Sequence, residues 1–175
     1  MKLISIISDT HGFLDKKSLE IVSQSDEVWH AGDFGYNNNI ENFIKKNSVR
    51  GVYGNIDGKE IRNQYPKINK FKCENIKVLI THIGGYPNRY KQDVEQEIKQ
   101  YKPDLYICGH SHILKVIYDP KYKLLHINPG ALGKEGFHKT RTIVIIKIDD
   151  KRIYDLEVVE LGSRTQLTNS INRIN

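Results

Sequence analysis

The chain has few cysteines and no long hydrophobic run. Only Cys73 and Cys108 occur among its 175 residues, without a CxxC pair, and this excludes a disulfide framework and a thiolate zinc site. The N-terminal apolar run, residues 3–7, is too short for the core of a signal peptide or for a membrane span. We therefore expect an unprocessed cytoplasmic protein that makes no membrane contact.

A block of lysine and arginine is also missing, although the chain is basic overall. The 27 Lys and Arg residues against 21 Asp and Glu give a formal net charge of +6. Because these cations are scattered, the pattern favours a solvated surface over a nucleic-acid patch, and it suits a small anionic substrate. With neither repeat nor linker, we expect a single domain over residues 1–175 whose tail after about residue 162 is loosely attached.

The hydrophobic pattern changes its period near residue 68. Before that point, short apolar strands alternate with amphipathic helices, which predicts parallel strands with right-handed crossovers. The elements expected there are strands at 3–7, 27–30 and 49–53 and helices at 15–25 and 38–47. Afterwards we expect antiparallel hairpins at 68–81, 115–127 and 142–161, with a helix at 92–101 and a buried strand at 105–108.

Five of these strands end in side chains that can bind a metal. The residues are Asp9, His11, Asp33, Asn55, His82, His110 and His112. Because parallel strands in one sheet bring their carboxyl ends to one edge, we expect the seven side chains to converge. Four histidines and two carboxylates are too many for one tetrahedral ion. They suit two divalent ions that share a carboxylate, about 3.5–4 Å apart.

Such a pair of ions would supply hydrolytic chemistry. Imidazole and carboxylate ligands suit Mn²⁺, which we expect, and also Ni²⁺, Fe²⁺ or Zn²⁺. Two ions lower the pKa of a shared water, so that a metal-bridging hydroxide forms near neutral pH. They also bind phosphoryl oxygens and stabilise the charge that develops there.

Individual fragments of this pattern also have structural interpretations. Asp9 is a possible helix cap, the segment 55–58 reads as a turn, and His30 lies within a strand, which favours a structural role. The loop 84–90 is rich in Gly, Pro and aromatic residues and is expected to form a wall on the substrate side. Its Arg89 either faces a phosphate group or is simply exposed.

The five blocks, in this order and spacing, resemble the calcineurin-like metallophosphoesterases, and among them the small single-domain bacterial and archaeal phosphodiesterases. The resemblance extends to about Leu161. It implies an α/β (α+β) fold, a four-layer β-sandwich of two mixed sheets flanked by helices. It also implies a dinuclear metal-dependent phosphoesterase, in the first place a phosphodiesterase that hydrolyses a small phosphodiester.

The resemblance further implies a role for each residue. One ion would be held by Asp9, His11, Asp33 and His112, and the other by Asp33, Asn55, His82 and His110, with Asp33 bridging the two. In our leading hypothesis, Asn55 and His82 also act in catalysis by helping to hold the phosphate or the second ion. The segment 128–130 looks like an Asn-Pro-Gly turn that small members carry beside the site.

One departure concerns the general acid. Larger members have Gly-Asn-His, whereas this chain has Gly54, Asn55 and Ile56, and isoleucine cannot protonate a leaving group. Either Asp57 or water takes this role, and a turn-forming role is favoured for Asp57. General acid catalysis is worth roughly 10²–10⁴-fold, so its loss predicts a slow enzyme or one selective for good leaving groups.

Two other functions compete with this hypothesis. A retromer subunit that resembles the family in fold is a scaffold, so a non-catalytic binding protein is one alternative; that subunit has lost part of the ligand set, which this chain retains. A nuclease is the other, and it predicts a contiguous basic face and salt-sensitive binding. The edges of the hairpins also allow pairing into a homo-oligomer, although nothing in the sequence requires it.

Overall fold

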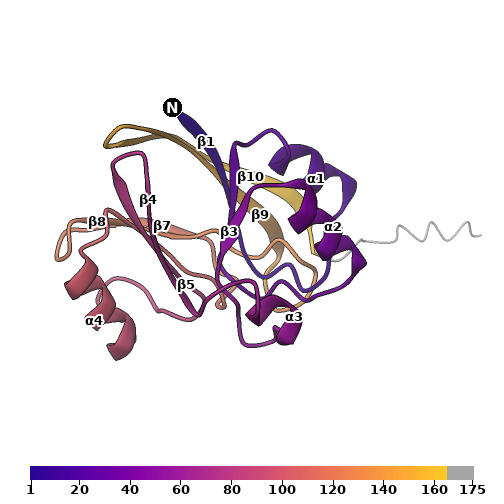
Figure 1. Ribbon diagram of the computed structural model, residues 1–175, viewed down its shortest axis with the longest axis horizontal. Helices are drawn as coiled ribbons and strands as arrows, with labels where there is room; N and C mark the ends of the chain where they lie inside the picture. The colour runs from indigo at the N-terminus through magenta and orange to yellow at the C-terminus, as the bar shows by residue number, and fades with distance from the viewer. Residues whose placement is uncertain (165–175) are drawn as a thin grey trace, which may run out of the picture.

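The computed structural model describes residues 1–164 and places them in two five-stranded sheets (Figure 1). The first sheet has the order β10-β9-β1-β2-β3. Its strands are β1 (Lys2–Ile7), β2 (Glu27–His30), β3 (Val49–Gly51), β9 (Thr140–Asp149) and β10 (Arg152–Ser163). The strands β1, β2 and β3 are parallel, as the alternating first half of the sequence predicts, and β9 runs antiparallel to β1.

The second sheet has the order β4-β5-β6-β8-β7. It contains β4 (Ile68–Cys73), β5 (Ile76–Thr81), β6 (Leu105–Ile107), β7 (Lys115–Asp119) and β8 (Leu124–Asn128). The pairs β4–β5 and β7–β8 are antiparallel, whereas β6 lies parallel to both β5 and β8. The three predicted hairpins are confirmed, since β9 and β10 are paired antiparallel in the first sheet.

Four helices are present in the described part of the chain. They are α1 (Lys16–Val22), α2 (Asn38–Lys46), α3 (Lys59–Arg62) and α4 (Gln92–Tyr101). The Asp15 carboxylate caps α1 by accepting a hydrogen bond from the backbone N–H of Ser18 at 2.9 Å. The three-residue spacing of Leu19 and Val22 predicts that both lie on the apolar face of α1. This is wrong for Leu19, which is exposed while Val22 is fully buried.

The core is arranged in layers. Between the sheets, Ile4, Ile6 and Trp29 of the first pack against Ile80 and Ile107 of the second. On the outer face of the first sheet, a second cluster includes side chains of α1 and α2, and a third lies between α4 and the second sheet. This helix–sheet–sheet–helix order confirms the predicted four-layer sandwich of two mixed sheets.

One expectation about the site is wrong in its topology. The strands that precede the candidate ligands do not share a sheet edge, because β1, β2 and β3 belong to the first sheet and β5 and β6 to the second. The site therefore lies where the two sheets present their strand ends together. The predicted loose tail falls mainly on residues 165–175, outside the described residues. Within residues 1–164, none of the helices has both the length and the apolar character needed to cross a bilayer.

Candidate metal centre

Backbone hydrogen bonds tie the strand-end loops to one another. The N–H of Asp9 donates to the carbonyl of Gly32 at 3.0 Å, and the N–H of His11 donates to the carbonyl of Asp33 at 3.1 Å. In the second sheet, the N–H of Gly109 donates to the carbonyl of His82 at 2.9 Å. The loops after neighbouring parallel strands therefore hold each other in place.

Five of the seven predicted ligands have a left-handed backbone. The φ angles are 53° at Asp9, 45° at His11, 58° at Asp33, 67° at His110 and 59° at His112. This region is uncommon for residues other than glycine, although Asp and His enter it more readily than most. Such sparsely populated conformations cluster at functional sites, where the surrounding structure enforces them.

A first group of potential ligand atoms comes from Asp9, His11 and His112, and these atoms lie within 4.8 Å of one another. The Asp9 side chain is fully buried. Its Oδ1 lies 3.2 Å from Nε2 of His112. Its Oδ2 accepts hydrogen bonds from the hydroxyl of Ser8 at 2.5 Å and from the backbone N–H of His110 at 3.1 Å. Asp9 is thus fixed by the loop that carries the two histidines.

His138 orients His112. Its Nε2 lies 3.0 Å from the carbonyl of Gly133, and its Nδ1 lies 3.3 Å from Nδ1 of His112. Because a carbonyl only accepts, Nε2 of His138 carries the proton, and burial lowers the pKa of His138 and so favours the neutral ring. The neutral Nδ1 then accepts from Nδ1–H of His112. The Nε2 lone pair of His112 is thereby directed at Asp9.

A second group consists of Asp33, His82 and His110, again within 4.8 Å of one another. Nδ1 of the buried His82 donates to the carbonyl of Ala31 at 2.7 Å. In the neutral ring Nε2 therefore has a lone pair, and it lies 3.2 Å from Oδ2 of Asp33 and 3.0 Å from Oδ1 of Asn55. The carbonyl of Ala31, directly after β2, fixes the tautomer of His82 in the same way as His138 fixes that of His112.

Asp33, a member of the second group, also approaches the first. Its Oδ2 is 3.6 Å from Nε2 of His11 and 3.2 Å from Nε2 of His82, while its Oδ1 accepts a hydrogen bond from the backbone N–H of Ile56 at 3.1 Å. Burial acts to raise the pKa of Asp33, but His82, the backbone N–H of Ile56 and His11 together outweigh it and the pKa is lowered. Asp33 is therefore a carboxylate in a position to be shared by two ions.

This arrangement fits divalent cations. Oδ1 of Asp9 and Nε2 of His11 are buried and have no hydrogen-bond partner among residues 1–164. At Asp9–His112 and at Asp33–His82, an imidazole nitrogen faces a carboxylate oxygen. When the ring is neutral both atoms are acceptors, and they repel unless a proton or a metal ion lies between them. Six of the seven residues predicted from the sequence make up these two groups, and the seventh, Asn55, contacts His82. Their nitrogen and oxygen donors suit first-row metals.

His30 has the structural role expected of it. Its ring is fully buried, its Nδ1 accepts from the N–H of Gly32 at 3.1 Å, and its Nε2 lies 3.0 Å from the hydroxyl of Thr10. Burial lowers the pKa of His30 to about 3, so the ring is neutral at physiological pH. It supports the loop that carries Asp33 without contributing to either group.

Asp57 forms a turn in which both of its carboxylate oxygens are occupied by backbone N–H groups. One of its oxygens accepts from the N–H of Gly35 at 3.0 Å and the other from the N–H of Gly54 at 2.8 Å. The turn beside the site is also present, because the Asn128 amide donates to the carbonyl of Gly109 at 2.9 Å. Both side chains hold ligand-bearing loops.

Comparisons with known proteins agree with this geometry. No curated protein sequence matches the chain. Among solved structures, a novel archaeal phosphodiesterase is 24% identical, with a TM-score of 0.72, over 91% of this chain and 99% of that one. A predicted phosphoesterase from Streptococcus pneumoniae is 21% identical with a TM-score of 0.65 over 91% and 97% of the chains. Vps29 of Entamoeba histolytica, solved with Zn²⁺, is 16% identical with a TM-score of 0.68 over 90% and 98%.

These structural similarities show the fold. The family is shown by a sequence model, the calcineurin-like phosphoesterase superfamily domain, which matches residues 1–151. That range includes every residue of the two ligand groups. The chain therefore belongs to the calcineurin-like phosphoesterase superfamily.

Proposed function

We propose that the protein is a dinuclear metal-dependent phosphodiesterase that hydrolyses a small phosphodiester. The observation that carries this proposal is the pair of neighbouring ligand groups, in which Asp33 of one group also lies 3.6 Å from His11 of the other. Two divalent ions bound there, Mn²⁺ being our first expectation, would lower the pKa of a shared water and neutralise charge on the phosphoryl group.

The proposed ligands divide between the two positions. The first ion takes Asp9, His11, Asp33 and His112, and the second takes Asp33, Asn55, His82 and His110. His138 and the carbonyl of Ala31 hold two of the histidines in the tautomer that presents Nε2. Partners of this kind outside the ligand shell typically change metal affinity by roughly 10–100-fold.

The residues beside Asn55 determine which leaving groups the site can release. The Asn55 side chain is exposed and therefore accessible to a phosphate group. Ile56 carries no proton to transfer, and both oxygens of Asp57 accept backbone N–H groups. A leaving group must therefore take its proton from water. We expect a steep dependence of the rate on the pKa of the leaving group, measurable with a series of substituted aryl phosphodiesters.

The direct test is hydrolysis of bis(p-nitrophenyl) phosphate with and without Mn²⁺. Asp33→Ala should lower kcat/KM by at least ~100-fold. Loss of a group that only orients a ligand already lowers activity by roughly 10–100-fold, and Asp33 is itself a proposed ligand of both ions. Asp155→Ala, which removes a carboxylate on the exposed surface of β10, is the matched control. Full activity of the Asp33 variant in Mn²⁺ would contradict the proposal.

A second candidate is a binding protein of the same fold that does not hydrolyse its ligand. The absence of a general acid at Ile56 and Asp57 favours it. Equilibrium dialysis against Mn²⁺ and Zn²⁺, combined with a panel of phosphomonoesters and phosphodiesters, separates the two candidates. Failure to bind stoichiometric metal, or metal binding without turnover of any ester, would support the binding protein.

A further inference from the structure

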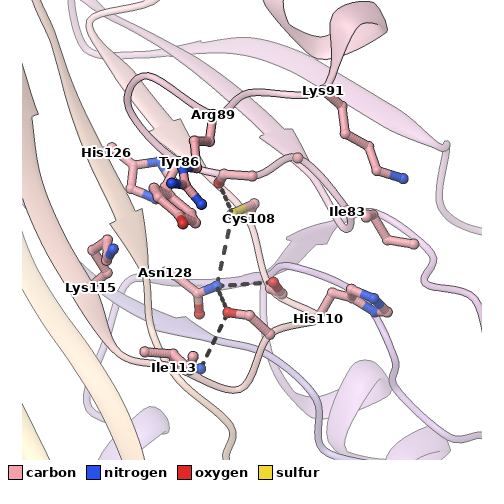
Figure 2. A pocket seen from close by; sticks show the side chains of 14 residues that line it. Ile83, Tyr86, Arg89, Lys91, Cys108, His110, Ile113, Lys115, His126 and Asn128 are labelled. Atoms are coloured by element: carbon pink, nitrogen blue, oxygen red, sulfur yellow. Dashed lines mark hydrogen bonds between the residues drawn. The ribbon is translucent and has the colours of Figure 1, made fainter.

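A pocket of about 410 Å³ opens beside His110 (Figure 2). Its walls come from the loop that follows β5, from the segment between β6 and β7, and from β8. Apolar surface is provided by Ile83, Ile113 and the ring of Tyr86. Because His110 belongs both to the second ligand group and to this wall, the pocket directly adjoins that group.

The pocket is lined by cations and by no carboxylate. Arg89, Lys91 and Lys115 are its charged residues, and within residues 1–164 none of them forms a salt bridge. The ammonium of Lys115 lies 4.0 Å from the centroid of the Tyr86 ring, which keeps it at the pocket wall. In the view of Figure 2, Arg89 and Lys115 lie on the side opposite His110. Unpaired cations around a cavity attract a negatively charged group.

His126 provides an independent indication of a ligand. It lines the pocket, is 1% exposed, and its Nδ1 is buried without a hydrogen-bond partner among the described residues. Buried polar atoms in native proteins are almost always paired, so an unpaired one beside a pocket is a hydrogen-bonding group for a water molecule or a ligand. Burial and the charge of Lys115 lower the pKa of His126 to about 4, so the ring is a neutral hydrogen-bonding group rather than a fourth cation.

We propose that this pocket binds a second phosphate group of the substrate. This phosphate is attached to the organic group that stays on the reacting phosphorus when the leaving group departs. The inference rests on the proposed phosphodiesterase function and narrows its substrate class to small organic phosphodiesters that also carry a phosphomonoester. The volume accommodates more than one phosphate, and the apolar wall of Ile83, Ile113 and Tyr86 suits the organic part between the two phosphates.

The test compares two chromogenic esters that differ only in the second phosphate. These are thymidine 5′-(p-nitrophenyl phosphate) and its 3′-phosphorylated derivative. The enzyme with Mn²⁺ should prefer the 3′-phosphorylated ester in kcat/KM by about tenfold, the equivalent of one charge-assisted hydrogen bond. Arg89→Ala, Lys115→Ala and His126→Phe should each reduce this preference, whereas Lys17→Ala, on the exposed surface of α1, should leave it unchanged.

A binding measurement separates failure of this inference from failure of the proposed function. Calorimetry with thymidine 3′,5′-bisphosphate and thymidine 5′-monophosphate needs no turnover. Tighter binding of the bisphosphate that is weakened by Arg89→Ala supports the pocket even if neither ester is hydrolysed. Equal kcat/KM for the two esters together with equal affinity for the two nucleotides would overturn the inference, and hydrolysis of both would then leave the phosphodiesterase function standing.

Discussion

Replacing His138 by alanine should weaken metal binding although His138 is not itself a proposed ligand. The substitution removes the acceptor that lies 3.3 Å from Nδ1 of His112. His112 is then free to place its proton on Nε2, the atom that faces Asp9. Loss of an orienting partner costs roughly 10–100-fold in affinity, or about 1.4–2.8 kcal/mol of binding free energy.

The assay is calorimetric titration of the metal-free protein with Mn²⁺, which should resolve two binding steps. Only the step that involves His112 should weaken in His138→Ala, and His138→Asn, whose amide oxygen can accept the same hydrogen bond, should recover part of the affinity. Phe137→Ala, at the fully exposed neighbouring position, is the control. Unchanged affinity of both steps in His138→Ala, with native circular dichroism, would refute the argument.

Three further predictions concern the bridging carboxylate, the metal and a buried ion pair. Gly54→Ala should abolish tight Mn²⁺ binding in the same titration, because its Cβ would lie 2.0 Å from Oδ1 of Asp33, whereas Gly58→Ala, which meets only the end of a flexible side chain, should not. Mn²⁺ at 100 times its Kd should raise the melting temperature by about 5–10 °C in a thermal scan, and EDTA should reverse this. Burial acts to raise the pKa of the Glu27 carboxyl, but hydrogen bonds from Arg50 and other donors outweigh it and lower this pKa to about 2. The lowered pKa contributes about 3 kcal/mol to the free energy of unfolding at pH 7, and this contribution is lost as pH falls from about 5 to 2. Urea titrations across that range should show Glu27→Gln approaching the wild type at low pH.

The secondary structure was predictable wherever a strong periodic signal existed. The runs of β-branched residues in β1, β5 and β9 marked buried strands, and the change of period near residue 68 marked the passage to hairpins. The four-residue helix α3 has too few turns to leave a pattern. Leu19 was misassigned because a three-residue spacing in a short helix does not establish which side faces the sheet.

The candidate ligands were predictable because each follows an apolar strand, a feature of local sequence. Their division between two sheets was not, since strand pairing depends on contacts between distant segments. His138 was missed because its partner, His112, lies 26 residues away in sequence. His126 was missed because it lines a pocket that several elements form together. Neither residue follows a recognisable motif. The turn-forming role of Asp57 was predictable, because aspartate favours turns in which its carboxylate accepts nearby backbone N–H groups.

The left-handed backbone at five of the proposed ligands has an evolutionary consequence. Each such residue costs of order 1 kcal/mol in the folded chain, and glycine would remove that cost. Without selection for ion binding, replacements such as His110→Gly would therefore increase the stability of the folded chain. A descendant that no longer bound the proposed ions should therefore accumulate glycines at these five positions first.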